Sequence, residues 1–233
     1  MKKIGIILGS GLDKFSNELK NISILYEDRV GIHHKRIIKG KINDAEVVVF
    51  QGRNHFYETS LKNKIYFNVN YAKELGLELL IITNAAGGVN ENFKVSDLML
   101  ITSHINLLFQ NISFKKHINL YDNELIEWVK RTAQNHKIKL QTGVYCSLTG
   151  PVYESNAEIG IWKKFNIDAA GMSTIPEILY ASKLGIKTIA ISCITNLLDS
   201  TPNKIIDHSE VIEAGAKAYK NFSKLLKALI NDY

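Results

Sequence analysis

Short apolar runs alternate with longer amphipathic segments from one end of the chain to the other. The runs are rich in Ile, Val and Leu and are bounded by Gly, Asn or Thr, which is typical of buried strands in a mixed sheet. They predict strands at Ile4–Leu8, Glu46–Gln51, Leu79–Thr83, Leu98–Thr102, Gly143–Leu148, Ile167–Ala170 and Thr188–Cys193.

The segments between these runs show helical periodicity. They predict helices at Leu61–Leu75, Leu125–Gln134, Ala157–Phe165, Pro176–Leu184 and His208–Ile230. The last helix is the longest, and Asp207 followed by Glu210 forms a capping pattern at its start. No internal repeat or low-complexity tract interrupts the alternation. The pattern therefore predicts one α/β domain over residues 1–233, with a mixed, twisted central β-sheet flanked by helices.

The residue composition and the net charge of the chain indicate which kinds of partner it could bind. Of the 233 residues, 45% are apolar and 22% are charged, as in ordinary globular proteins. The net charge of +6 is spread along the chain, with Lys35, Lys39 and Lys41 as the only local cluster. Because a nucleic-acid binder usually carries a basic stripe with interleaved aromatic residues, we expect no nucleic-acid partner.

Several features bear on the compartment and on metals. No segment approaches the roughly 20 apolar residues of a membrane helix, and Gly9-Ser10-Gly11 interrupts the first apolar run, which is therefore no signal peptide. Cys146 and Cys193 lie in apolar runs and are expected to be buried thiols of a reducing compartment. These features predict a cytoplasmic protein without membrane association. The seven histidines show no ligand spacing with Cys or acidic residues, so no metal site is expected.

Small and polar residues end the first two predicted strands, and ligand sites in open α/β sheets collect at such ends. Gly9-Ser10-Gly11 offers N–H groups and a hydroxyl to an anion, although a strand-to-helix turn needs similar residues for structural reasons. It does not complete the dinucleotide-binding fingerprint. Arg53 and His55 project to the same side of an extended segment and could hold an oxyanion, or they could lie in a solvated turn.

Two further strand ends carry candidate ligand contacts. Thr83–Gly88 is rich in small residues that let a ligand approach the backbone, or it is a loop that needs positive φ. After the strand ending at Leu148, Tyr153 could stack on a planar base while Glu154 accepts its N–H groups. Alternatively, Glu154 or Ser155 caps the helix that follows.

The last two strand ends are also polar. Ser173 and Thr174 precede a helix with Pro176 near its first turn, so helix capping is one explanation for them. Thr195-Asn196 ends the apolar run of the final predicted strand. Each motif could be explained locally, but their number and order point to one site.

Together these runs resemble the successive signatures of the trimeric, low-molecular-mass purine nucleoside phosphorylases, within the nucleoside phosphorylase/methylthioadenosine phosphorylase family. The similarity extends over essentially the whole chain, and Thr83–Gly88, Gly150–Glu158 and Gly171–Glu177 are its most diagnostic parts. It implies a nucleoside phosphorylase-like fold, a homotrimer and a place in purine salvage. The implied reaction is reversible phosphorolysis of inosine, guanosine and their deoxy forms to free base and α-D-(deoxy)ribose 1-phosphate. Inorganic phosphate is the co-substrate, and no cofactor is implied.

The resemblance also assigns roles to individual residues. Phosphate is expected at Ser10, His33, Arg53, His55, Ser173 and the backbone N–H of Ala85, with His34 as an alternative to His33. The nucleoside is expected at Tyr57, Tyr153, Glu154, Met172, Asn196 and His208. The expected catalytic residues are Asn196, Glu154 and His55. Among them, Asn196 contacts N7 and O6 of the base, and Glu154 accepts from N1–H.

The chain departs from the family pattern at three places. Tyr153 stands where Phe is frequent, and Leu197 where Lys is frequent. The segment 106–123 looks shorter than in the mammalian-type enzymes. A neighbouring subunit normally lends a Phe to the ribose pocket from that segment, and Phe109 and Phe114 are both candidates.

Three other functions are compatible with parts of the pattern. A 5′-methylthioadenosine phosphorylase shares the fold and chemistry, but it typically carries Asp where Asn196 stands. A nucleosidase that uses water would not need the anion-binding cluster. A nucleoside-binding protein on the same scaffold would bind without turnover.

Overall fold

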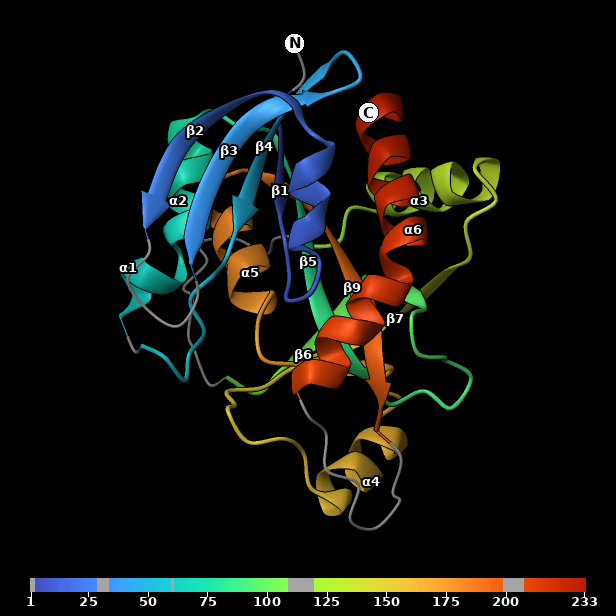
Figure 1. Cartoon of the computed structure of the whole chain (residues 1–233). Helices are drawn as coiled ribbons and strands as arrows, with labels where there is room; N and C mark the ends of the chain where they lie inside the picture. Colours follow the sequence, from blue (N-terminus) through green and yellow to red (C-terminus); the bar gives the residue numbers. More distant parts are fainter. Residues whose placement is uncertain (1–2, 29–33, 60, 109–119, 199–207) are drawn as a thin grey trace.

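A nine-stranded sheet forms the centre of the computed structural model, which describes residues 3–28, 34–59, 61–108, 120–198 and 208–233 (Figure 1). The strands are β1 (Ile4–Ile7), β2 (Lys20–Asp28), β3 (Lys35–Ile42), β4 (Ala45–Gln51), β5 (Leu79–Gly88), β6 (Leu98–Asn106), β7 (Leu140–Ser147), β8 (Ala169–Gly171) and β9 (Lys187–Leu197). The helices are the 3-10 helix η1 (Asp13–Glu18), α1 (Lys62–Ile65), α2 (Phe67–Glu74), α3 (Asn123–Asn135), α4 (Asn156–Lys164), α5 (Ile175–Lys183) and α6 (His208–Asp232).

The strand order is β2-β3-β4-β1-β5-β8-β7-β6-β9, and β9 also pairs with β5. Because of that extra pairing, the strands from β5 to β9 close on themselves, while β1 to β4 extend from the closed part as an open sheet. Strands β1, β4, β5 and β9 run parallel to one another. Their carboxyl ends therefore meet at one edge of the sheet, where ligands bind in α/β folds.

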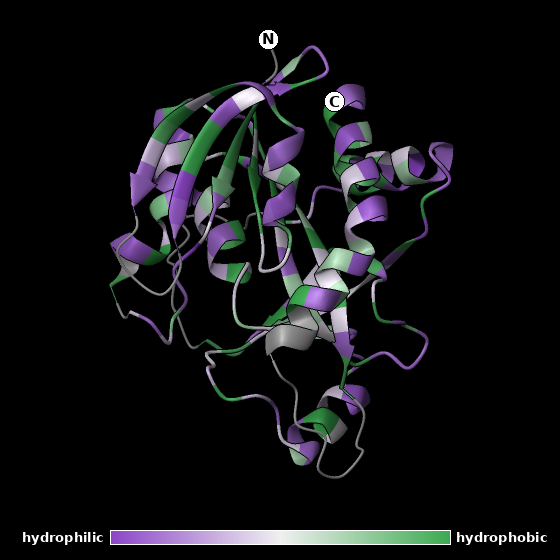
Figure 2. Cartoon of the chain, viewed as in Figure 1, coloured by the Kyte–Doolittle hydropathy of each residue, from purple (hydrophilic) through white to green (hydrophobic). Residues whose placement is uncertain are grey.

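Alternate residues of the strands face two helical layers (Figure 1). Ile4 and Ile6 pack into one core with η1, α3 and α6, whereas Ile7 packs into the other with α2 and α5. In Figure 2 the central strands are largely hydrophobic, and the helices alternate between hydrophobic and hydrophilic residues. This two-sided burial explains why the central strands are continuous apolar runs. The predicted α/β fold with a mixed sheet is confirmed.

The predicted helices and strands are present, with differences at their ends. Leu61–Leu75 is not one helix, because it is divided at Tyr66 into α1 and α2. Strands β2 and β3 lie at the open edge of the sheet and were not predicted. Side chains of β2 are mostly exposed and β3 is rich in Lys, so neither segment contains a long apolar run.

Two strands extend further than predicted. Thr83–Gly88 belongs to β5, and none of these six described residues has positive φ, so the loop interpretation was wrong. Asn196 likewise lies within β9 rather than after it. The reason is the closure of the sheet: Gly87 and Gly88 pair with β8 on one side and with β9 on the other.

The caps and the cysteines can be compared with their predictions. Ser155 forms a complete capping box with Glu158 at the start of α4, which confirms the capping alternative for that residue. Asp207 and the side chain of Glu210 lie outside the described residues. Cys146 and Cys193 are buried, unpaired thiols as predicted, and burial raises the pKa of each to about 12. No described helix is both long and apolar enough to span a membrane.

Candidate active site

A cavity of about 570 Å³ opens at the carboxyl edge of the parallel strands. Its lining includes most of the residues predicted for the site: Ser10, Arg53, His55, Tyr57, Ala85, Tyr153, Glu154, Met172, Ser173 and Asn196. His33 lies outside the described residues, and the structure does not describe the side chain of His208. His34, the alternative to His33, lines the cavity.

The turn after β1 is held tightly against β5. Thr83 accepts a hydrogen bond from the backbone N–H of Gly9 (3.1 Å) and donates one to the carbonyl of Ile7 (3.0 Å). A Cβ atom at position 9 would lie only 2.5 Å from the Cα of Asn84, so only glycine fits there. This close approach brings the Ser10 turn and the second half of β5 to the same side of the cavity.

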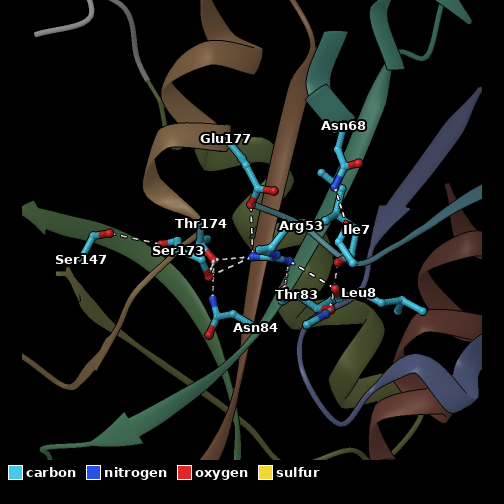
Figure 3. Close-up of polar contacts among 12 residues, drawn as sticks. Ile7, Leu8, Arg53, Asn68, Thr83, Asn84, Ser147, Ser173, Thr174 and Glu177 are labelled. Carbon is cyan, nitrogen blue, oxygen red and sulfur yellow. Dashed lines mark hydrogen bonds and ion pairs between the residues drawn. The ribbon is translucent and has the colours of Figure 1, made fainter. Parts of the chain in front are cut away.

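Arg53 is buried, with 5% of its side chain exposed, and its guanidinium is held on several sides (Figure 3). Nη2 donates to the carbonyl of Thr83 at 2.6 Å. Nη1 donates to Ser173 Oγ at 3.0 Å and to Thr174 Oγ1 at 3.3 Å, and it forms an ion pair with Glu177 at 3.1 Å. The interpretation of Arg53 as part of a solvated turn was wrong, because its charge is buried and compensated.

His55 lies on the same cavity as Arg53 and has its own carboxylate partner. Its Nδ1 is 2.6 Å from Glu58 Oε1, and its ring stacks on Tyr57 with centroids 5.0 Å apart and an interplanar angle of 12°. The carboxylate favours a hydrogen on Nδ1 and thereby fixes the orientation of the ring.

Ser173 is presented to the cavity by a strained turn. Thr174 has φ 78° and ψ −55°, and the N–H of Ile175 donates to the carbonyl of Ser173 (2.9 Å), as in a γ-turn with positive φ. A β-branched residue rarely adopts this conformation, and such strain is often found at functional sites. Hydrogen bonds from Asn84 Nδ2 (2.9 Å) and Arg53 to Thr174 Oγ1 hold the turn. Because Thr174 makes no side-chain cap on α5, and Ser173 interacts with Arg53, the capping explanation for this pair was wrong.

A second group of polar residues lines the cavity near α4 and the end of β9. Glu154 is half-buried, and burial raises the pKa of its carboxyl group above the usual range. Asn196 is buried, and its Oδ1 accepts from Thr195 Oγ1 at 3.1 Å, which fixes the amide. Tyr153 is 40% exposed beside them. The cavity thus combines an anion-binding cluster with an aromatic ring, a carboxyl group and an amide.

Comparison with known proteins decides the family. The sequence profile of the Phosphorylase superfamily matches residues 3–231. Purine nucleoside phosphorylase 1 of Bacillus subtilis (strain 168) is 38% identical over 250 aligned residues, which cover 99% of this chain and 92% of that protein. The chain belongs to the purine nucleoside phosphorylase family. The predicted family and enzyme class are confirmed.

Solved structures of purine nucleoside phosphorylases share this fold. The Schistosoma mansoni enzyme in complex with inosine has a TM-score of 0.87 and 28% identity, and covers 99% of this chain and 90% of its own. The same enzyme in complex with adenosine has a TM-score of 0.88 and 29% identity, with the same coverage. The match extends over the whole sheet, so it confirms the nucleoside phosphorylase-like fold.

Sequence reasoning missed the carboxylates behind the phosphorylase site. Glu58 follows His55 by three residues and looks like an ordinary turn residue. Glu177 lies in the first turn of α5, where an acidic residue is explained by the helix dipole. Only the position of Glu177 at the end of the Gly171–Glu177 motif hints at a role. Among the described residues, no three His, Cys, Asp or Glu side chains form a group that could hold a metal ion.

Proposed function

We propose that this purine nucleoside phosphorylase catalyses the reversible phosphorolysis of inosine, guanosine and their 2′-deoxy forms. The products are the free 6-oxopurine and α-D-ribose 1-phosphate or its deoxy form. Inorganic phosphate is the co-substrate, and the reaction needs no cofactor. The observation that carries the proposal is that one cavity is lined both by the anion-binding pair Arg53 and Ser173 and by the pair Glu154 and Asn196.

Phosphate binds at the end of the cavity formed by the β1 turn, β5 and the γ-turn. Its ligands are the side chains of Ser10, Arg53, His55 and Ser173, the N–H of Ala85, and His33 or His34. Ser173 Oγ accepts from Arg53 and lies 3.3 Å from Thr174 Oγ1, so its hydrogen can donate to that hydroxyl or, when phosphate is bound, to a phosphate oxygen. Arg53 supplies the positive charge and the other groups supply directional donors, which together orient the nucleophile.

Phosphorolysis exchanges one bond at C1′ for another. A phosphate oxygen attacks C1′ with inversion while the C1′–N9 bond breaks, and the bonding electrons leave with the purine. The ribose passes through an oxocarbenium-like state, which the adjacent phosphate dianion stabilises. Tyr57, Tyr153, Met172 and His208 hold the ribose so that C1′ faces the phosphate.

The purine leaves more easily when its developing charge is stabilised. Oδ1 of Asn196 is engaged by Thr195, so Nδ2 is left to donate to N7 of the purine. Glu154, as a carboxylate, accepts from N1–H, a group that inosine and guanosine carry and adenosine lacks. Adenosine leaves this half-buried carboxylate without a donor, which favours 6-oxopurines in catalysis.

Glu154 confers a pH dependence on base binding. Burial raises the pKa of Glu154, so on acidification this side chain is protonated at a higher pH than an ordinary Glu. Once protonated, it no longer accepts from N1–H as a carboxylate. We expect KM for inosine to rise as pH falls towards that pKa, and Glu154→Gln to lower kcat/KM by about 10- to 100-fold and to abolish this rise. Steady-state kinetics between neutral and mildly acidic pH measure both effects. An unchanged acidic limb in the variant would contradict the role of Glu154.

The assembly and compartment are part of the same proposal. Three apolar side chains on α4 and on the residues that flank it are exposed: Val152 (82%), Ile161 (51%) and Phe165 (66%). They support a subunit contact beside the cavity. A homotrimer would cover these three side chains. Phe109 and Phe114, the candidates for the residue lent to a neighbouring subunit, lie outside the described residues. The unpaired buried thiols favour the cytoplasm, where purine salvage takes place.

The substrate assignment is tested by four nucleosides at saturating phosphate. Inosine and guanosine should release base with kcat/KM at least about 100-fold above adenosine and 5′-methylthioadenosine. Higher activity on either 6-aminopurine nucleoside would overturn the assignment of Glu154 and Asn196.

A further inference from the structure

A buried carboxylate lies behind the guanidinium of the phosphate site (Figure 3). Glu177 is 3% exposed, and its Oε2 forms the 3.1 Å ion pair with Nη1 of Arg53. Burial raises the pKa of Glu177, and the positive charge of Arg53 opposes that rise. Because replacing a buried ion pair by apolar side chains is often neutral or stabilising, stability alone is a weak reason for this pair.

Glu177 does not reach the place where substrates would bind. It is absent from the lining of the 570 Å³ cavity, whereas Arg53 and Ser173 line it. Glu177 instead lines a cavity of about 10 Å³ on the other side of Arg53, together with Ser173 and Thr174. The carboxylate therefore contacts the guanidinium from behind and would not contact a phosphate ion.

The contacts of Nη1 link the carboxylate to the hydroxyl that faces the cavity. The same nitrogen that pairs with Glu177 donates to Ser173 Oγ at 3.0 Å. Ser173 Oγ also lies 3.3 Å from Thr174 Oγ1, to which Nη1 donates as well. Because a hydroxyl that accepts from one side turns its own hydrogen elsewhere, the position of Nη1 limits the directions in which the Ser173 hydroxyl can donate. A shift of Nη1 would therefore displace the positive charge of Arg53 and redirect the Ser173 hydroxyl, both of which belong to the phosphate site.

We propose that Glu177 is a positioning residue for phosphate binding: it fixes Arg53 so that Nη1 orients the Ser173 hydroxyl towards the bound anion. The inference rests on the proposed function, because it takes the ligand at Arg53 and Ser173 to be phosphate. Glu177 holds Nη1 through this ion pair, which needs both its negative charge and its reach, since among the described residues neither of its oxygens accepts a hydrogen bond.

Two variants separate the effect of the side-chain length of Glu177 from the effect of its charge. Glu177→Asp keeps the charge but withdraws the carboxylate by about 1.5 Å, one C–C bond, from Nη1. Glu177→Gln keeps the length and an oxygen acceptor but removes the charge. Glu18→Asp is the matched control, because Glu18 bonds Tyr219 and Lys227 between η1 and α6, away from the cavity.

The readouts are the Kd of inorganic phosphate by calorimetry and the KM values of phosphate and inosine. We expect Glu177→Asp to raise Kd and KM for phosphate by tenfold or more, with KM for inosine within twofold. Glu177→Gln, which removes the ion pair, should raise the phosphate Kd at least as much as Glu177→Asp does, and Glu18→Asp should change none of these values.

Other outcomes overturn the inference. A phosphate Kd in Glu177→Gln within threefold of that of the unchanged protein would mean that the ion pair does not position Arg53. Equal changes for phosphate and inosine, or a lower melting temperature with unchanged phosphate Kd, would mean a merely structural role. If the unchanged protein binds phosphate but does not cleave inosine, the proposed function fails while the Kd series still decides the role of Glu177. If it binds no phosphate, the inference fails.

Discussion

Arg53→Met is expected to lower kcat for inosine phosphorolysis by about 100- to 1,000-fold, because it removes the only full charge assigned to the phosphate site. It should also lower the free energy of unfolding by about 3–5 kcal/mol, since the Glu177 carboxylate is left buried without its partner. Steady-state kinetics and urea denaturation measure the two effects.

A double variant separates these consequences. Arg53→Met combined with Glu177→Leu should recover most of the lost stability, because an apolar pair replaces the ion pair, while activity stays lost. Arg36→Met is the control: Arg36 forms a half-exposed ion pair with Glu27 on β2 and β3, so both quantities should change little. Activity of Arg53→Met within tenfold of the unchanged protein would contradict the phosphate site.

Asn196→Asp is expected to change which purine is cleaved. The carboxylate cannot donate to N7 unless protonated, and it repels O6 of a 6-oxopurine, so kcat/KM for inosine should fall by about 100-fold or more. The 6-amino group of adenosine can donate to the new carboxylate, so the ratio of adenosine to inosine activity should rise. Kinetics with both nucleosides at saturating phosphate measure this ratio.

The control for this change is Asn43→Asp, in the exposed turn between β3 and β4, which should leave the ratio unchanged. KM for phosphate should stay within about threefold in both variants, since neither residue belongs to the phosphate site. A fall for inosine and adenosine alike would mean that Asn196 supports the strand rather than recognising the base.

The parts of the fold that depend on apolar runs could be predicted from the sequence. Strands β1, β4 and β9 are buried on both faces, so their sequences are continuous runs of apolar residues. Strand β2 is mostly exposed at the sheet edge and carries no such signal. The closure between β5 and β9 could not be predicted either, because Gly87 and Gly88 look like a loop until their partners in β8 and β9 are known.

Most of the residues predicted for the site from their types and order line one cavity, but their hydrogen-bond and ion-pair partners were not predicted. Arg53 and Ser173 are recognisable donors in recognisable motifs, and both line the cavity. Their hydrogen bond joins segments far apart in the sequence. The ion pair of Arg53 with Glu177 forms only in the folded chain, where the first turn of α5 lies against the segment that follows β4, and the γ-turn at Thr174 is held by Asn84 and Arg53 from other segments. Local sequence patterns carry no information on such packing.

The proposed reaction uses phosphate, rather than water, to cleave the nucleoside. The direct measurement is to incubate the protein with inosine in buffers with and without phosphate, and to quantify hypoxanthine and ribose 1-phosphate by chromatography and phosphorus NMR. We predict one α-D-ribose 1-phosphate for each hypoxanthine, and no base release without phosphate. Release of hypoxanthine with free ribose in phosphate-free buffer, or no release in either buffer, would contradict phosphorolysis by this protein.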